Sequence, residues 1–131
     1  MIPRAIARWH EIVASRDARG LDALLADDVV FHSPVVHTPQ SGRPIVTAYL
    51  AAALAVLGGG TFRYLRKWHA DRSAVLEFEA GIEGIVVNGV DMIAWDDDDR
   101  IVEFKVMIRP LKAIQLIHRK MADALVAVQR Q

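Results

Sequence analysis

Residues 88–109 read Asn88-Gly-Val-Asp-Met-Ile-Ala-Trp95, then four aspartates at 96–99, then Arg100-Ile-Val-Glu-Phe-Lys-Val-Met-Ile-Arg109. Two runs rich in β-branched and aromatic residues around a polar turn are typical of a β-hairpin. A symmetric turn would place Trp95 opposite Arg100 and Asp91 opposite Phe104. Since side chains alternate along a strand, one face would carry a single carboxylate among apolar neighbours. The residues predicted to share that face are Gly89, Asp91, Ile93, Trp95, Val102, Phe104, Val106 and Ile108.

Asp91 is the strongest candidate for a functional residue, because a carboxylate is costly to bury on an apolar sheet face. Desolvation disfavours the charged form, so we expect its pKa to be raised. Such an acid can donate a hydrogen bond to an oxygen of an apolar ligand, or shuttle a proton. The alternative is a structural Asp that pairs with a backbone N–H or a histidine.

The rest of the chain is predicted to place helices before the sheet and one helix after it. Pro3 and Pro44 open helical patterns, and Gly58-Gly59-Gly60 ends the second of these. Alternating residues from Thr61 onward predict consecutive antiparallel strands. The expected helices are 3–18, 21–26, 44–57 and 111–129, and the expected strands before the hairpin are 29–33, 62–69 and 73–83.

This order of elements predicts the α+β class. We expect a curved antiparallel sheet that forms a cone around the N-terminal helices, with an extra C-terminal helix at 111–129. Residues 1–131 are expected to form a single domain. A sheet of this shape would leave a blind apolar cavity beneath the helices, and such cavities are common sites for small molecules.

The composition excludes several classes of function. The chain has 16 basic and 16 acidic residues, so no basic field indicates nucleic acid. It has no cysteine, which excludes disulfides and thiolate metal sites and fits a cytoplasmic protein. No apolar run approaches the roughly 20 residues that span a bilayer. Gly58–Gly60 follows a helix rather than a strand, so we expect no phosphate-bearing cofactor. The acidic residues form no oxygen-ligand loop pattern, so we expect no metal.

Two groups of acidic residues are explained more simply by an exposed position than by catalysis or cation binding. Glu77, Glu79 and Glu83 recur at strand spacing and could form an acid–base pair or a cation site. We predict instead an outward face that is solvated or paired with Lys and Arg. The four aspartates at 96–99 are interpreted as a solvated turn.

Three segments carry a family resemblance: Ala26-Asp-Asp-Val-Val-Phe-His-Ser-Pro34, the helix start at Gly42-Arg43 before Tyr49, and Gly89-Val-Asp-Met-Ile-Ala-Trp-Asp-Asp-Asp-Asp-Arg-Ile101. They resemble the nuclear transport factor 2-like superfamily, a cone-shaped α+β group. That group includes ketosteroid isomerases, SnoaL-like polyketide cyclases and limonene epoxide hydrolases. The resemblance covers about residues 3–110 and implies the fold more strongly than any one activity.

The resemblance assigns roles to three positions. Asp91 corresponds to the ketosteroid isomerase Asp that stays protonated and donates to the developing oxyanion. Trp9 stands at the position of the oxyanion Tyr, and Ser33 at that of the general-base Asp. An indole N–H can donate a hydrogen bond, but a serine cannot replace a carboxylate base. We therefore predict no ketosteroid isomerase. The Asp–Arg–Asp set of limonene epoxide hydrolases is not found either, since Asp91 and Arg109 are predicted on opposite faces.

Two histidines lie near the pocket mouth in the superfamily layout. Strand alternation sends His32 and Ser33 to opposite sides, so only one of them faces the cavity, and the sequence leaves open which. An inward His32 would be a candidate base, whereas His37 is interpreted as a loop residue. The aromatic residues predicted to line the cavity are Trp9, Tyr49, Phe62, Phe78, Trp95 and Phe104, with Trp68 as a further candidate.

Three functions stay open at this stage. The first is an enzyme of the isomerase, cyclase or hydratase type, with Asp91 as acid, His32 as possible base, and Trp9 or Tyr49 as positioning donor. The second is a non-catalytic protein that binds an apolar metabolite, and the third is a structural domain.

The expected partners are a small apolar molecule and a second copy of the chain. The resemblance implies dimerisation through the outer sheet face, for which we predict Val90, Met92, Ala94, Ile101 and Met107. The apolar stripe of the last helix needs cover from its own sheet or from a second subunit. That stripe is predicted to contain Leu111, Ile114, Ile117, Met121, Leu125 and Val128.

Overall fold

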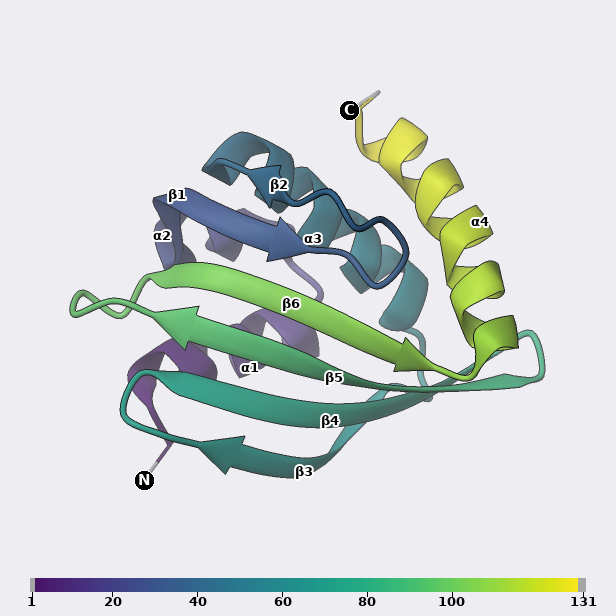
Figure 1. The fold of residues 1–131 in the computed structure, drawn as a ribbon, viewed down its shortest axis with the longest axis horizontal. Helices are drawn as coiled ribbons and strands as arrows, with labels where there is room; N and C mark the ends of the chain where they lie inside the picture. Colours follow the sequence, from purple (N-terminus) through teal and green to yellow (C-terminus); the bar gives the residue numbers. More distant parts are fainter. Residues whose placement is uncertain (1, 130–131) are drawn as a thin grey trace.

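The computed structural model of the protein describes residues 2–129. One six-stranded sheet has the order β2-β1-β6-β5-β4-β3, and the helices lie on its concave side (Figure 1). The predicted α+β class is confirmed. The helices are α1 (Arg4–Ser15), α2 (Leu21–Leu24), α3 (Arg43–Leu57) and α4 (Leu111–Gln129), with a short 3₁₀ turn at Ala18–Gly20. The strands are β1 (Leu25–His32), β2 (Gln40–Ser41), β3 (Arg63–His69), β4 (Ser73–Ile82), β5 (Ile85–Trp95) and β6 (Ile101–Arg109).

Two features of this arrangement were not predicted. The strand β2 is a two-residue edge strand in what was expected to be a loop. The strand β1 pairs with β6 in parallel, whereas the other pairings are antiparallel. The parallel pair needs a long crossover, which α3 and the β3–β5 meander provide.

The hairpin of β5 and β6 differs from its predicted register by two residues. Asp91 pairs with Val106 rather than Phe104, and Trp95 pairs with Ile101 rather than Arg100. The loop is one residue longer than expected, because the Asp96 carboxylate accepts hydrogen bonds from the N–H groups of Asp98 and Arg100. The register then shifts again before Ala94 pairs with Glu103.

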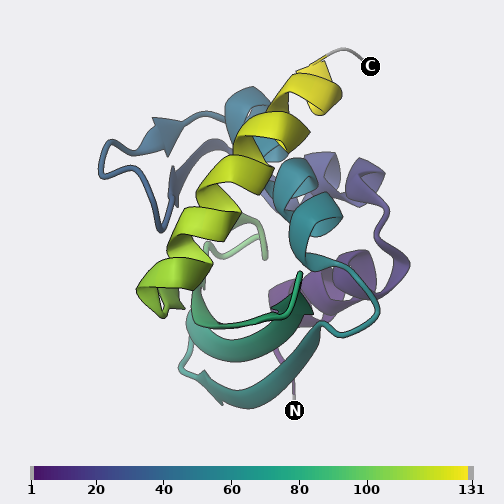
Figure 2. The same cartoon turned by 90° about the vertical axis from the view of Figure 1, so that its right-hand side faces the viewer.

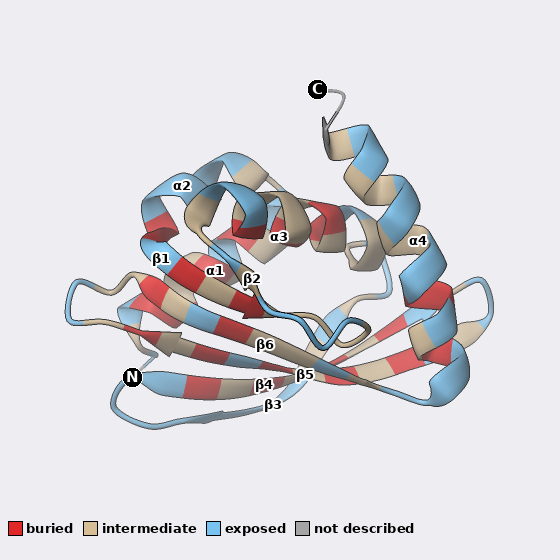
Figure 3. Ribbon diagram, turned by 45° about the horizontal axis from the view of Figure 1, so that its top comes forward, coloured by how far each residue is buried: buried red, intermediate tan, exposed pale blue. Residues whose placement is uncertain are grey.

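This second shift is a β-bulge at Val102, and it preserves the predicted inner face. The longer loop alone would have shifted β6 by one residue and turned its side chains over. The bulge adds another residue, so Phe104 is buried on the inner face as predicted. Ile101, predicted on the outer face, is instead fully buried. Figure 3 shows the alternation of buried and exposed residues along these strands.

The C-terminal helix packs on its own chain. It crosses one end of the curved sheet, alongside α3 (Figure 2). Ala113, Leu116 and Ile117 are its buried residues. Leu111, predicted in the apolar stripe, is 69% exposed, because the helix turns Ala113 and Leu116 toward the protein instead. None of the described helices is long and apolar enough to cross a membrane.

The outer sheet face carries cross-strand ion pairs. Glu77 bonds to Arg66 at 2.6 Å and Glu79 to Arg63 at 3.1 Å. Glu83 lies in the turn after β4, where it pairs with Lys120 of α4. These contacts favour the structural interpretation of the glutamates over an acid–base site.

Gly89 allows an aromatic side chain to cross the inner face of the sheet. It pairs regularly with Phe78 and Ile108. A Cβ atom at this position would lie 2.6 Å from Cζ of Phe78 and 2.5 Å from the carbonyl oxygen of Met107. The missing side chain therefore makes room for the buried Phe78 ring.

We predict that Gly89→Ala lowers the free energy of unfolding by about 1–3 kcal/mol, because the methyl group overpacks the core. Gly81→Ala is the matched control on the neighbouring strand. Its new Cβ would meet only Oγ1 of Thr61, at an ordinary 3.7 Å, so its effect should stay within about 0.5 kcal/mol. Urea denaturation of both variants measures the difference, and equal losses would contradict the close approach of Phe78 to Gly89.

Candidate functional site

A cavity of about 240 Å³ lies between the concave face of the sheet and the helices α1, α3 and α4. Its wall is largely apolar, with side chains from all three of these helices and from β1, β3, β4, β5 and β6. Ser33, Tyr49, Tyr64, Asp91 and His118 add polar groups to this wall. A mostly apolar cavity with a few polar groups is typical of a small-molecule site.

A chain of two hydrogen bonds crosses the cavity wall and ends at Asp91. Trp9 of α1 donates from its indole Nε1 to the hydroxyl of Tyr64, at 2.8 Å. Tyr64 of β3 donates from that hydroxyl to Oδ2 of Asp91 on β5, at 2.7 Å. The three side chains therefore join the first helix to two strands that do not neighbour each other in the sheet.

The environment of Asp91 favours its protonated form. Burial raises the pKa of this carboxyl to about 7, and the hydrogen bond from Tyr64 opposes part of that rise. Burial and the adjacent Asp91 raise the pKa of the Tyr64 hydroxyl well above its ordinary value. Near neutral pH, Tyr64 is therefore a neutral donor, while Asp91 exists in both protonation states.

One oxygen of Asp91 is available to a ligand. Within residues 2–129, its only side-chain hydrogen bond is the one that Oδ2 accepts from Tyr64. The residue lines the cavity. Oδ1 can accordingly accept from a bound hydroxyl when Asp91 is ionised. A protonated Asp91 can donate its own hydrogen to a bound carbonyl oxygen.

His10 lies behind this chain, with its ring 5.2 Å from that of Tyr64 in an edge-to-face contact. Its Nε2 is buried and has no hydrogen-bond partner among the residues that the structure describes. Burial, followed by the nearby charge of Lys67, lowers the pKa of His10. A neutral imidazole thus supports the Tyr64 ring by packing.

The cavity contains five of the six aromatic residues predicted to line it: Trp9, Tyr49, Phe62, Phe78 and Phe104. Trp95 instead packs in the core of the domain, because it lies near the hairpin end of β5, four residues beyond Asp91. Trp68 lies on the outer surface, with the guanidinium of Arg66 5.4 Å from its ring. These two tryptophans do not reach the cavity.

The structure decides between His32 and Ser33. Ser33 lines the cavity, whereas Nε2 of His32 lies 3.3 Å from Oε2 of Glu103, an exposed side chain of the adjacent strand β6. His32 could act as a base in the cavity only if its side chain pointed inward, and it does not. The Ser33 hydroxyl accepts hydrogen bonds from the N–H groups of Val35 and Val36, which shapes the loop at the end of β1.

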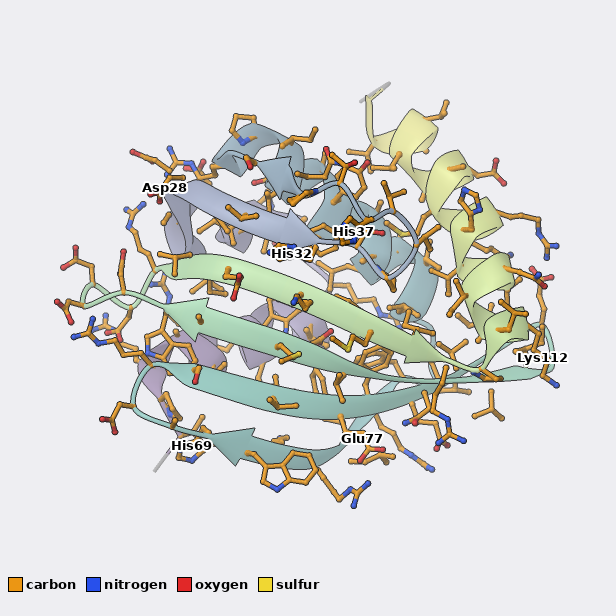
Figure 4. The ribbon with its side chains drawn as sticks, viewed as in Figure 1. Asp28, His32, His37, His69, Glu77 and Lys112 are labelled. Carbon is orange, nitrogen blue, oxygen red and sulfur yellow. The ribbon has the colours of Figure 1, made fainter. Side chains whose placement is uncertain are left out.

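The other acidic and histidine side chains are dispersed. Figure 4 shows His32 and His37 near β1, His69 and Glu77 near β3 and β4, and Lys112 at the start of α4. Among the described residues, no group of three or more His, Asp or Glu side chains is placed to hold a metal ion.

Sequence reasoning missed Tyr64. The available signal was strand alternation, which places Tyr64 on the same side of the predicted strand 62–69 as the predicted lining residue Phe62. A buried phenol also needs a hydrogen-bond partner. Its actual partners lie 55 residues before it and 27 residues after it, so their contact depends on tertiary structure.

The SnoaL-like domain family model matches residues 6–104. The chain belongs to the SnoaL-like domain family. Its predicted place in the nuclear transport factor 2-like superfamily is thereby confirmed. A search of curated proteins found no match.

Solved structures support the same assignment of this SnoaL-like protein. It is 40% identical to a steroid delta-isomerase from Pseudomonas aeruginosa, with a TM-score of 0.90, over 97% of this chain and 93% of that one. It is 33% identical to a Silicibacter pomeroyi protein with a cystatin-like fold, with a TM-score of 0.81, over 95% and 84% of the chains. A Catenulispora acidiphila protein with a ketosteroid isomerase-like fold, in complex with trimethylamine, is 14% identical over 87% and 91%, with a TM-score of 0.64, and shows the fold alone.

We predict that Asp91 makes stability fall as the pH rises from about 4 to 7. The unfolded chain ionises this carboxyl near its ordinary pKa of 3.8, whereas the folded protein keeps the proton until about pH 7. Over that interval the folded state binds more protons, so the free energy of unfolding falls, by roughly 4 kcal/mol in total.

Asp91→Asn removes this dependence and keeps an oxygen that accepts from Tyr64. The variant should be about as stable as the wild type at pH 4 and more stable at pH 8. Urea unfolding of both proteins at pH 4, 6 and 8 measures the difference, in which the contributions of other titrating groups cancel. A difference that does not change with pH would contradict a raised pKa for Asp91.

Proposed function

We propose that this SnoaL-like protein is an acid–base enzyme of the isomerase type that acts on a small apolar molecule with a carbonyl group. The observation that carries the proposal is the position of Asp91, which lines an apolar cavity with one oxygen held by Tyr64 and the other available. A general acid or base works best when its pKa lies near the working pH, and the pKa of Asp91 is about 7.

The two protonation states of Asp91 supply the two halves of a proton transfer. The ionised carboxylate accepts a proton from a carbon next to the carbonyl group. The electron pair of that C–H bond forms a carbon–carbon double bond to the carbonyl carbon, and the π pair of the carbonyl group moves onto its oxygen to give an enolate. The carboxylic acid then returns the proton to another carbon of the conjugated system. The enolate electrons re-form the carbonyl group as that carbon is protonated, so neither protons nor electrons are gained or lost and the isomerisation needs no redox partner. Tyr64 holds Oδ2 throughout and orients the carboxyl group.

Similarity to a Pseudomonas aeruginosa steroid delta-isomerase supports the reaction type. The volume of the cavity favours a substrate that is smaller than a steroid. An apolar cavity of about 150 Å³ holds one benzene ring, so about 240 Å³ encloses a one- or two-ring portion of a ligand.

A second candidate is a binding protein without turnover. Its support comes from Ser33, which occupies the position that the ketosteroid isomerase resemblance assigns to a carboxylate base. Asp91 is the sole carboxylate among the described residues that line the cavity. In this alternative, Asp91 anchors a ligand hydroxyl or carbonyl oxygen and transfers no proton.

Our test measures binding and turnover of cyclic enones, phenols, terpenoid ketones and polyketide-like rings. We expect the ligand class that raises the melting temperature of the wild type to bind Asp91→Asn roughly 10-fold more weakly, because an amide forms a weaker hydrogen bond to the ligand oxygen than the carboxyl group does. Isomerisation of cyclic enones, followed by ultraviolet absorbance, should fall at least 100-fold in Asp91→Asn.

Asp28→Asn is the matched control, since Asp28 is exposed on β1, away from the cavity (Figure 4). It should change neither binding nor turnover. Binding that depends on Asp91 without any turnover would favour the second candidate. Absence of binding, or equal binding by both variants, would refute both.

We also propose that the protein forms a homodimer through the outer face of the sheet. Trp68 and Met107 are each about half exposed there, and Met92 lies between them in the sheet, 37% exposed. Among the charged side chains near them, Arg66 pairs with Glu77 on the same face. Lys105 is the cross-strand neighbour of Met92. A largely apolar face can pair with its own copy around a two-fold axis.

Met92→Lys should convert the dimer to a monomer, because the new ammonium group would be buried against its symmetry mate. Light scattering during size-exclusion chromatography measures the mass. Val126→Lys is the control, since it adds the same charge on an exposed position of α4. A wild-type monomer at every concentration tested, or a Met92→Lys variant that stays dimeric, would contradict the proposed interface.

A further inference from the structure

The C-terminal helix forms one wall of the cavity. Five residues of α4 line it: Ile117, His118, Met121, Ala122 and Leu125. The SnoaL-like family match ends at residue 104, before this helix begins. The helix is thus an addition to the matched region, and it contributes directly to the place where a ligand would sit.

His118 is the polar residue on this wall. Its side chain is exposed to solvent and also lines the cavity, so it lies where the cavity opens. Positions 118, 122 and 125 follow helical spacing and share one stripe of α4, in which Ala122 and Leu125 are apolar. Within residues 2–129, no hydrogen bond or ion pair engages the His118 side chain, so its ring nitrogens are available to a bound molecule.

His118 and Asp91 lie on different elements and at different depths of the cavity wall, since the His118 side chain is exposed whereas Asp91 is buried. Asp91 belongs to the closed end, where Trp9 of α1 and Tyr64 of β3 surround it. Along β6, its partner Val106 is followed by Ile108, and both side chains line the cavity. The helix then starts at Leu111 and crosses the end of the sheet (Figure 2), with His118 seven residues, or about 10 Å, along its axis. Apolar wall separates the two polar groups.

We propose that His118 is a ligand-binding and specificity-determining residue, and that the ligand is a one- or two-ring apolar molecule with a hydrogen-bonding oxygen at each end. This inference rests on the proposed function. A carbonyl or hydroxyl oxygen binds Asp91 at the closed end. The second oxygen, of a hydroxyl or carboxylate group, binds the imidazole of His118 at the mouth. The rings between them contact the apolar wall.

Naphthalene derivatives test this arrangement, because they are rigid and carry substituents at opposite ends. The probes are 2-naphthol, with one oxygen, and 2,6-dihydroxynaphthalene and 6-hydroxy-2-naphthoic acid, each with a polar group at both ends. We expect both two-ended probes to bind the wild type about 3–10-fold more tightly than 2-naphthol, as one additional hydrogen bond provides. Calorimetric titration at pH 6 measures the three affinities.

His118→Leu should abolish the preference for the two-ended probes and leave 2-naphthol binding unchanged. His118→Gln, which can still donate and accept, should retain part of the preference. Arg119→Ala is the matched control, since Arg119 is the exposed next residue of α4 and lies outside the cavity wall. An unchanged preference in Arg119→Ala would exclude a general effect of the positive charges on the helix.

The outcomes separate this inference from the proposed function. If 2-naphthol binds in an Asp91-dependent manner but the two-ended probes gain nothing, His118 has no ligand role and the inference is wrong. A preference for the two-ended probes that persists in His118→Leu would also show that the inference is wrong. If no probe binds the wild type, or if Asp91→Asn changes nothing, the proposed function fails, and the inference fails with it.

Discussion

The hydrogen bond from Tyr64 to Asp91 is the contact on which the site depends. A carboxyl group in an apolar cone can be tolerated if it stays protonated or if a donor compensates its charge. Both conditions apply here: burial raises the pKa of Asp91 to about 7, and Tyr64 donates to one of its oxygens. Trp9 then satisfies the Tyr64 hydroxyl as an acceptor, so the buried polar network is closed on the protein side and open at one oxygen.

This network has the geometry of a binding site because the sheet is curved. Tyr64 on β3 reaches over β4 to Asp91 on β5, and Gly89 on β5 leaves room for the ring of Phe78 on β4. The helix α4 then crosses the end of the curved sheet and adds His118 to the mouth of the cavity. A flat sheet with the same residues would expose Asp91 to water and lose the perturbation of its pKa.

Membership of the SnoaL-like family places the protein among relatives that include a steroid delta-isomerase. The residues that line the cavity narrow the range of reactions that can be proposed. Ser33 in place of a carboxylate base leaves Asp91 as the cavity's carboxyl group among the described residues. In the proposed reaction the proton therefore begins and ends on that group. A single shuttling carboxyl is sufficient for an isomerisation, which returns the proton that it removes.

The sequence by itself determined the fold class, the inward direction of Asp91 and most of the aromatic lining, because side-chain alternation along a strand is a local property. The predicted inner face of β6 is correct although the predicted register is wrong by two residues, because the longer loop and the bulge at Val102 each added one residue. The buried position of Ile101, the outward direction of His32 and the pairing of Tyr64 with Asp91 were decided by tertiary structure. The longer loop before Ile101 depends on hydrogen bonds to the Asp96 carboxylate. The direction of His32 depends on its contact with Glu103 of the adjacent strand, and the position of Tyr64 depends on partners far away in the chain. The contacts of His32 and Tyr64 join segments that are distant in sequence and form only when the sheet curves and the helices pack against it, so no local pattern encodes them.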